Sequence, residues 1–293
     1  MVNKIKLYEN YYSWWKNVDK TILFFVISFF IAGLFFSLAS TSLIASDRLN
    51  TNSYYFFIKH LIFILIGFFM MFLFSLLNEN LLIKISIGLF ILFFILLLLV
   101  PFIGAEVKGS KRWLDLPFLP RFQPVELIKP FYVVILAFFL NHQKYNLYFK
   151  YLLSLFLIIP IVLLLISQPD IGQTMLIVFT WLALIFISGI NLIIFFGLFG
   201  FFLTILLYLI FFVERFNYIK IRISYFFDSS SNSYSQAEKA SEAIIDGGFF
   251  GKGIGEGTLN SRIPEAHTDY IISVIAEEFG IIIVIIIMIL FLI

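Results

Sequence analysis

The chain has 293 residues, of which 61% are hydrophobic, 20% aromatic and 13% charged, and its mean hydropathy is +1.03. A soluble domain is about 45–50% apolar and about 25% charged, so this composition excludes an ordinary soluble globular protein and predicts a membrane protein. The lack of cysteine excludes disulfides, thiolate metal sites and a cysteine nucleophile, while the net charge of +2 decides nothing about partners.

Eight apolar runs are candidates to cross a bilayer, for which a helix needs about 20 residues. In chain order they are Thr21–Ile44, Phe57–Leu77, Leu81–Phe102, Leu127–Leu140, Leu147–Ile166, Ile171–Ile187, Leu192–Val213 and Tyr270–Ile293. The fourth is short unless its helix begins among the polar residues before it. Helices satisfy their own backbone in lipid, and the runs are too uniformly apolar for barrel strands. We therefore predict an all-α polytopic membrane protein, with residues 1–293 forming a single transmembrane domain.

The orientation follows from the N-terminal segment, residues 1–20. Its four lysines favour a cytoplasmic N-terminus, and the first apolar run is too long for a signal-peptide core, so we expect a retained helix. Two long connectors, residues 103–126 and 214–269, are then extracytoplasmic, the second lying between spans seven and eight. Most of the 20 Lys and Arg would face outward, against the positive-inside rule. A basic outer surface suits an anionic, lipid-linked substrate, although the charges could equally face anionic headgroups.

The first long connector carries a dense polar cluster. Lys111 and Arg112 are cations suited to phosphate oxygens, and Trp113 suits the depth of the membrane interface. A Gln-Pro pair then predicts the start of a helix with Glu126 in its first turn and Lys129 one turn later. This (i, i+3) spacing allows an ion pair at the membrane boundary. The residues alone leave open whether the pair is a structural salt bridge or a substrate contact.

The second long connector contains a helical pattern over residues 236–246, closed by a Gly-Gly helix stop. The glycines at 251, 253 and 255 superficially resemble a nucleotide loop, but no strand precedes them and no Gly-Lys-Ser/Thr follows. We expect these glycines to let the backbone approach a sugar or the membrane surface. Elsewhere, Asp170 is expected to cap the sixth span, and Glu277 and Glu278, inside the last apolar run, to have a structural or gating role.

A second candidate site stands immediately before the last apolar run, where His267 and Asp269 occur. Placing an ionised Asp in hydrocarbon costs roughly 2.5–3.5 kcal/mol on insertion scales. A carboxylate at the end of a membrane-spanning segment therefore needs an explanation. One reason is a helix cap. The other is chemistry at the point where water meets a lipid-borne substrate. His267 is either a plain polar loop residue or a group that orients the carboxylate.

Five short motifs follow one another along these connectors. They are Lys111-Arg112-Trp113, Gln123-Pro124-Val125-Glu126-Leu127-Ile128-Lys129, Gln168-Pro169-Asp170-Ile171-Gly172, Gly247-Gly248-Phe249-Phe250-Gly251-Lys252-Gly253 and Pro264-Glu265-Ala266-His267-Thr268-Asp269-Tyr270. The ordered set resembles the SEDS family, the bacterial shape, elongation, division and sporulation proteins that include FtsW, RodA and SpoVE. Trp14-Trp15 and the Pro-Glu-Ala-His-Thr-Asp stretch are most similar to division-type members such as FtsW.

Two features depart from the family pattern. Val125 stands where members usually have Ser, which removes a hydroxyl from the polar cluster. Members also have ten spans, whereas eight are predicted here, so we expect this chain to be a truncated member.

The resemblance implies a peptidoglycan glycosyltransferase that polymerises lipid II, an undecaprenyl-diphosphate-linked disaccharide-pentapeptide. Its donor sugar is alpha-linked and its product is beta-1,4-linked, so displacement at the anomeric carbon inverts configuration. Asp269 matches the family's catalytic aspartate and would act as general base. The candidate substrate-binding residues are Lys111, Arg112, Trp113, Glu126, Lys129 and His267. A divalent cation, Mg or Mn, held by Asp269 or Glu126 is a further candidate, although no cluster has compelling metal-ligand spacing.

The family also implies partners and a place. These are a class B penicillin-binding protein transpeptidase, other division proteins and the inner membrane at the septum, with no nucleic acid. A lipid II flippase and a non-catalytic scaffold are the competing functions. A transporter would carry charges midway through several helices, whereas here the charges gather on one outer face, which favours the polymerase.

Overall fold

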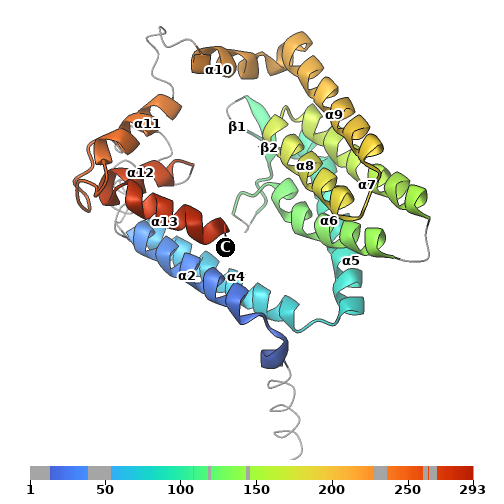
Figure 1. Cartoon of the computed structure of the whole chain (residues 1–293), viewed down its shortest axis with the longest axis horizontal. Coiled ribbons are helices and arrows are strands. Elements are labelled where there is room, and N and C mark those ends of the chain that lie inside the picture. The colour runs from blue at the N-terminus through green and yellow to red at the C-terminus, as the bar shows by residue number, and fades with distance from the viewer. Residues whose placement is uncertain are drawn as a thin grey trace, which may run out of the picture. The chain divides into compact units, whose positions relative to one another are not determined.

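The structure is a computed structural model that describes residues 14–38, 54–107, 109–117, 120–142, 146–227, 236–259, 263 and 269–292. By their internal contacts the residues form two compact units. One unit comprises residues 77–227, and the other comprises residues 1–76 together with 228–293. Helices make up most of both units (Figure 1).

The unit of residues 77–227 is a helix bundle with one small hairpin. Its elements are α5 (Glu79–Ile103), β1 (Ala105–Val107), β2 (Ser110–Trp113), α6 (Pro124–Asn141), α7 (Leu147–Ser167), α8 (Ile171–Ile187), α9 (Leu192–Phe212), the 3-10 turn η2 (Glu214–Phe216) and α10 (Asn217–Phe227). The core between α5, α6, α7 and α8 contains Trp181 and Tyr132, both at most 1% exposed. The Trp181 indole donates to Ser154 Oγ at 3.1 Å, which satisfies its one polar group.

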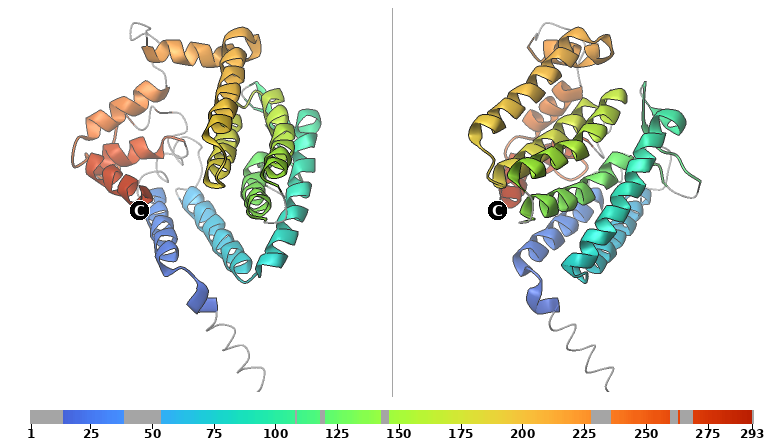
Figure 2. Two further views of the ribbon diagram at one scale, coloured as in Figure 1. Left: turned by 45° about the vertical axis from the view of Figure 1, so that its right-hand side comes forward. Right: turned by 90° about the vertical axis from the view of Figure 1, so that its right-hand side faces the viewer.

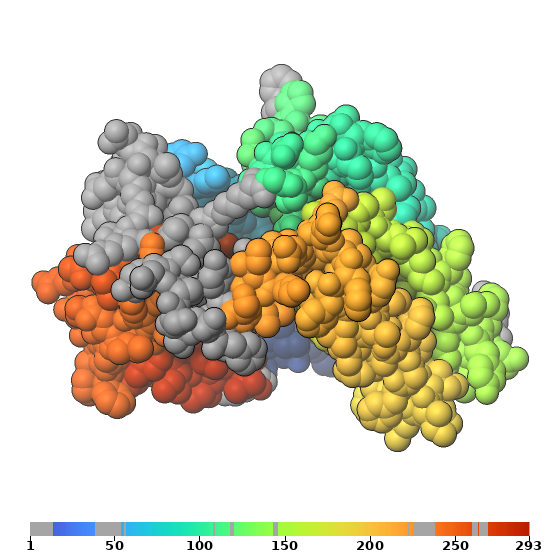
Figure 3. Space-filling model, turned by 90° about the horizontal axis from the view of Figure 1, so that it is seen from above, coloured from blue at the N-terminus to red at the C-terminus, as the bar shows by residue number. Residues whose placement is uncertain are grey.

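In the described residues of the other unit, two N-terminal helices occur with three C-terminal ones. They are α2 (Lys20–Phe36), α4 (Tyr55–Ser75), α11 (Gln236–Gly247), α12 (Ile271–Phe279) and α13 (Ile281–Leu292). α2 lies beside α4, with the Phe30 and Phe68 rings in an edge contact at 4.8 Å. Phe291 of α13 stacks on Phe29 of α2 at 4.2 Å. The left view of Figure 2 shows α11 beside α12, and α11 to α13 form one close-packed block in Figure 3.

The prediction of an all-α membrane protein is confirmed. Among the described residues, five helices are long and apolar enough to cross a bilayer, namely Phe57–Ser75, Glu79–Ile103, Pro124–Asn141, Leu147–Ser167 and Leu192–Phe212. Three shorter apolar helices are Lys20–Phe36, Ile171–Ile187 and Ile281–Leu292. Each of the first seven predicted spans coincides with one helix, although residues 39–44 of the first lie outside the described part. The fourth helix does begin among polar residues, at Pro124.

The eighth span was predicted as one helix, and this is wrong. The chain breaks at Gly280 (φ +86), between α12 and α13. A helix end leaves carbonyl groups without amide partners, which is costly away from water. Here the backbone N–H groups of Lys252 and Gly253 donate to the carbonyl oxygens of Glu277 and Glu278, at 2.9 and 3.1 Å. The Gly-rich segment 247–253 therefore completes the hydrogen bonding of the broken helix.

Two glycines of this segment, Gly247 and Gly251, are needed for that contact, because the backbone that they approach is that of α12. A Cβ atom on Gly251 would lie 2.2 Å from the carbonyl oxygen of Glu278, and one on Gly247 would lie 2.1 Å from that of Ala276. The N–H of Ile281 in turn donates to the Gly248 carbonyl at 3.0 Å.

We expect Gly251→Ala to destabilise the protein by about 1–3 kcal/mol, because the residue has a φ of +79 and its Cβ would meet backbone atoms. Gly197→Ala in α9 is the matched control: nothing lies within 4 Å of its Cβ, so it should be neutral or slightly stabilising. The measurement is the melting temperature of purified protein in detergent. Equal melting temperatures for the two variants would contradict the close contact.

Both long connectors contain more structure than was predicted. In the first, β1 and β2 pair as an antiparallel hairpin whose turn holds Gly109 (φ +78). In the second, helix α11 confirms the predicted helix and ends one residue later, at Gly247. The preceding helix α10 was not predicted.

Candidate functional site

An arginine of β2 holds the turn between α7 and α8. Arg112 donates from Nε to the carbonyl oxygen of Gln168 at 3.3 Å and from Nη2 to that of Pro169 at 2.5 Å. Its Nε also lies 3.6 Å from Asp170 Oδ2. The Tyr218 hydroxyl of α10 donates to the same Pro169 carbonyl at 3.0 Å. Residues from three separate parts of the sequence therefore converge on the Gln-Pro-Asp turn.

Asp170 starts helix α8, as predicted. Its carboxylate accepts from the backbone N–H of Gln173 at 3.3 Å, and the Thr174 hydroxyl donates to its carbonyl oxygen at 2.7 Å. The residue is only 6% exposed. A buried carboxylate needs compensation, and here the helix N-terminus and the Arg112 guanidinium supply it.

Glu126, Lys129 and Gln173 form a closed network between α6 and α8. Lys129 Nζ lies 2.6 Å from Glu126 Oε2, which confirms the predicted (i, i+3) pair. Lys129 also donates to Gln173 Oε1 at 3.0 Å, and Gln173 Nε2 donates to Glu126 Oε1 at 2.5 Å. The Glu126 side chain is 48% exposed and that of Lys129 23%. Such an exposed pair adds only about 0–1 kcal/mol of stability, so the main effect of the network is to orient the charges.

The other residues of the first cluster lie on the hairpin. Lys111 is exposed and pairs in register with Glu106, and Trp113 is partly buried. The pairing shifts here, because Glu106 pairs with Lys111 whereas Ala105 pairs with Trp113, so Arg112 is an extra residue in β2. Arg112 is bonded to the α7–α8 turn, and Lys111 is exposed.

Asp269 lies in an exposed turn of the other unit, two residues before α12 begins at Ile271. The N-cap of α12 is Tyr270, and in the described part of the chain no side chain caps this helix. Helix capping therefore does not explain Asp269, in contrast to Asp170. His267 lies outside the described residues.

Sequence reasoning missed Gln173 and Tyr218. Each bonds a residue 40 or more positions away, so no local spacing could reveal the contact. The available signal was weak: Gln173 is a polar residue inside an apolar run. Gln168 was noticed only as part of a motif, yet its side-chain nitrogen is buried without a hydrogen-bond partner among the described residues.

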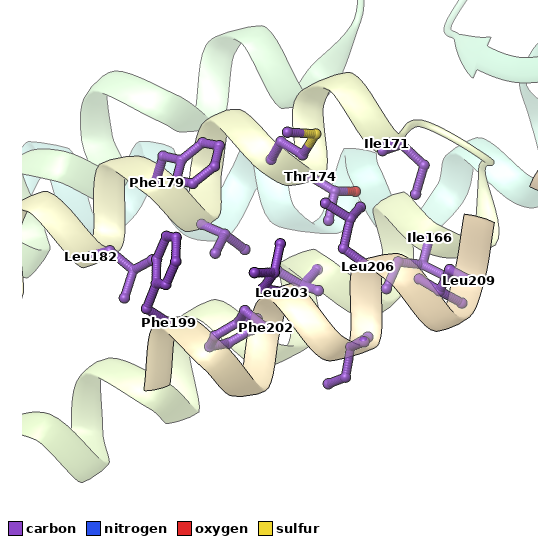
Figure 4. A pocket seen from close by; sticks show the side chains of 14 residues that line it. Ile166, Ile171, Thr174, Phe179, Leu182, Phe199, Phe202, Leu203, Leu206 and Leu209 are labelled. Atoms are coloured by element: carbon purple, nitrogen blue, oxygen red, sulfur yellow. The ribbon is translucent and has the colours of Figure 1, made fainter. Parts of the chain in front are cut away.

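A small apolar pocket of about 60 Å³ lies between α8 and α9 (Figure 4). Thr174 supplies the one polar side chain of its lining, and that hydroxyl already donates to the Asp170 carbonyl. The pocket suits hydrocarbon and offers no group for catalysis. Its lining includes Ile171, Thr174, Phe179, Leu182, Phe199 and Phe202.

Comparison with known proteins agrees with the motif resemblance. A family model for FtsW, RodA and SpoVE, described as cell cycle protein, matches residues 19–293. A probable peptidoglycan glycosyltransferase FtsW of Caulobacter vibrioides is 30% identical over 270 residues, covering 92% of this chain and 68% of that protein. The protein of the same name from Wigglesworthia glossinidia brevipalpis is 32% identical over 303 residues, covering 99% of this chain and 76% of the relative.

Solved structures share the fold. A chain from a study of structural coordination of polymerization and crosslinking by a peptidoglycan synthase complex matches with a TM-score of 0.71 and 23% identity, covering 94% of this chain and 75% of that chain. The rod shape determining protein RodA of Thermus thermophilus matches with a TM-score of 0.58 and 23% identity, covering 94% of this chain and 72% of that one.

Proposed function

The chain belongs to the FtsW, RodA and SpoVE family of cell cycle proteins, and we propose that it is a peptidoglycan glycosyltransferase that polymerises lipid II during cell division. The reaction would take place at the outer face of the cytoplasmic membrane. The main support is the family match over nearly the whole chain together with relatives named as peptidoglycan glycosyltransferases. Asp269 supports the same proposal, because its carboxylate is exposed and does not cap helix α12.

The proposed reaction is a displacement at the anomeric carbon of the donor sugar. An acceptor hydroxyl attacks this carbon, the bond to the diphosphate oxygen breaks, and configuration inverts. Asp269 takes the hydroxyl proton as general base, a contribution typically worth about 10²–10⁴-fold in rate. A base for this role must reach the acceptor and must not be occupied in holding a helix end, and Asp269 meets the second condition.

The leaving group is undecaprenyl diphosphate, whose negative charge grows as the bond breaks. Lys129 is the cation best prepared to meet it, because Glu126 and Gln173 fix the ammonium group from two sides. Preorganised charges stabilise a transition state without reorganisation at the moment of reaction. Lys111 and Trp113 of β2 are proposed to contact the substrate, and Arg112 to act mainly by holding the turn that starts α8.

We also propose a role for a divalent cation, Mg or Mn. The described residues contain no group of three His, Asp or Glu side chains that could hold a metal ion, so no step above depends on one. Diphosphates themselves bind such cations. Assays with Mg, with Mn and with a chelator would show whether the cation is required.

We further propose that a class B penicillin-binding protein transpeptidase is the partner at the division septum of the inner membrane. The structural match to a chain of a peptidoglycan synthase complex supports this proposal. The direct test is to incubate the purified protein and its cognate transpeptidase with labelled lipid II. Glycan chains are the expected product, and their absence with an active partner would overturn the proposed activity.

The topology has its own test. Because the chain has no cysteine, Glu256→Cys in the second long connector and Glu79→Cys at the start of α5 each introduce a single thiol at an exposed position. We expect a membrane-impermeant maleimide to label Glu256→Cys in intact spheroplasts and Glu79→Cys only after lysis. The reverse pattern would place the long connectors in the cytoplasm.

A further inference from the structure

Glu277 connects helix α12 to two other segments of its unit. It is 0% exposed. Its side-chain Oε1 accepts the backbone N–H of Leu259 at 2.8 Å, and its carbonyl oxygen accepts the N–H of Lys252 at 2.9 Å. One residue of α12 is thus bonded to the Gly-rich segment and to the start of the segment that leads to Asp269.

Packing holds three described residues near Asp269 in the sequence, namely Leu259, Ile263 and Tyr270. Ile263 is 0% exposed and lies in a cluster with Ala240 and Ala243 of α11 and with Val274 of α12. Leu259 and Tyr270 pack against the same cluster. Leu259, Ile263 and Tyr270 are therefore fixed to α11 and α12.

Resting on the proposed function, we infer that Glu277 is a positioning residue for the Asp269 carboxylate. It lies eight residues after Asp269, about 12 Å away at 1.5 Å per helical residue, so it does not touch the reacting atoms. It acts through Leu259, which packs against the same cluster as Tyr270, the residue next to Asp269. Positional errors of about 1 Å at a reacting group cost roughly 10²-fold in rate.

The chemistry of the side chain supports this inference. An apolar residue would cost less to bury at this position, whereas a buried carboxylate must be compensated by hydrogen bonds. A carboxylate also makes a stronger bond to a backbone N–H than a neutral acceptor does. Among the described residues, no backbone carbonyl accepts the Leu259 N–H, and the Glu277 carboxylate supplies the acceptor instead.

The test uses the full chain with its transpeptidase and compares three variants. Glu277→Gln keeps a side-chain oxygen acceptor for Leu259, and Glu277→Leu removes it while keeping the volume. Glu242→Leu, at an exposed position of α11, removes a carboxylate elsewhere in the unit and is the control. Two quantities are measured: amide hydrogen exchange of peptides that contain Leu259, and kcat and KM for polymerisation of labelled lipid II.

We expect Glu277→Leu to speed exchange at Leu259 and to lower kcat by about 10-fold to 10²-fold, with KM changed less than about threefold. Glu277→Gln should restore most of the protection and most of kcat, and Glu242→Leu should match the parent chain. Unchanged exchange at Leu259 in Glu277→Leu would overturn the inference whether or not Asp269 is the base. Faster exchange with an unchanged kcat would overturn it as well. An active Asp269→Asn variant would instead remove the proposed function and leave the exchange result standing.

Discussion

Arg112→Ala is expected to lower the rate of lipid II polymerisation by roughly 10–150-fold. The guanidinium donates to two carbonyl groups of the α7–α8 turn and lies next to the buried Asp170 carboxylate. Losing a charge-assisted hydrogen bond typically costs about 1.5–3 kcal/mol, and the buried carboxylate would also lose its cation. The same turn starts α8, which carries Gln173. Its disruption should therefore also disturb the orientation of Lys129.

Two further variants show whether the geometry or the charge of Arg112 is responsible for its effect on the rate. Arg121→Ala removes the same charge from the same connector, where Arg121 pairs with Asp115 at 2.8 Å and both side chains are about half exposed. Exposed pairs contribute little, so near-normal activity is expected. Arg112→Lys keeps the charge but not the planar fork that reaches two carbonyls, so it should stay strongly impaired. A fully active Arg112→Lys would show that a bare positive charge suffices.

Stability measurements on the same variants separate two roles for Arg112. If it mainly holds the turn, the melting temperature of Arg112→Ala should fall together with the rate. A loss of rate at an unchanged melting temperature would favour the direct diphosphate contact that the sequence suggested. The contacts to Gln168 and Pro169 lead us to expect a fall in both.

Local patterns were the reliable part of the sequence interpretation. The Gln-Pro pair marks the start of α6 because proline fits the first turn of a helix, and the spacing of Glu126 and Lys129 places them on one face. Asp170 caps α8 for the same kind of local reason. Each of these contacts joins residues within one turn of helix, so the spacing in the sequence was sufficient.

Contacts between distant segments were not predictable in this way. Gln173 closes the Glu126–Lys129 pair from a helix 44 positions away. The break at Gly280 lies inside a continuous apolar run, and its orphan carbonyls are satisfied by a loop that comes earlier in the chain. Hydropathy reports how much of a segment is apolar, not whether its backbone bonds are made within the helix or with another segment. The role of the Gly-rich segment could therefore be seen only once its partner helix was located.

Asp269→Asn is expected to reduce glycan synthesis by about 10²-fold or more while the protein stays folded and bound to its transpeptidase. The amide has nearly the same shape as the carboxylate but cannot take a proton from the acceptor hydroxyl. Asp269 is exposed and does not cap α12, so the substitution removes no described contact that supports the fold. An unchanged melting temperature should therefore accompany the loss of rate.

Asp115→Asn, an exposed carboxylate to amide change in the first connector, is the matched control and should keep the parent rate. The assay is polymerisation of labelled lipid II in detergent, where no leaflet crossing is needed. A flippase or a scaffold would not itself form the polymer, so these alternatives predict no dependence of detergent-phase synthesis on Asp269. Polymer formed by Asp269→Asn at more than about a tenth of the parent rate would contradict the catalytic assignment, because the loss of a general base typically costs at least about 10²-fold.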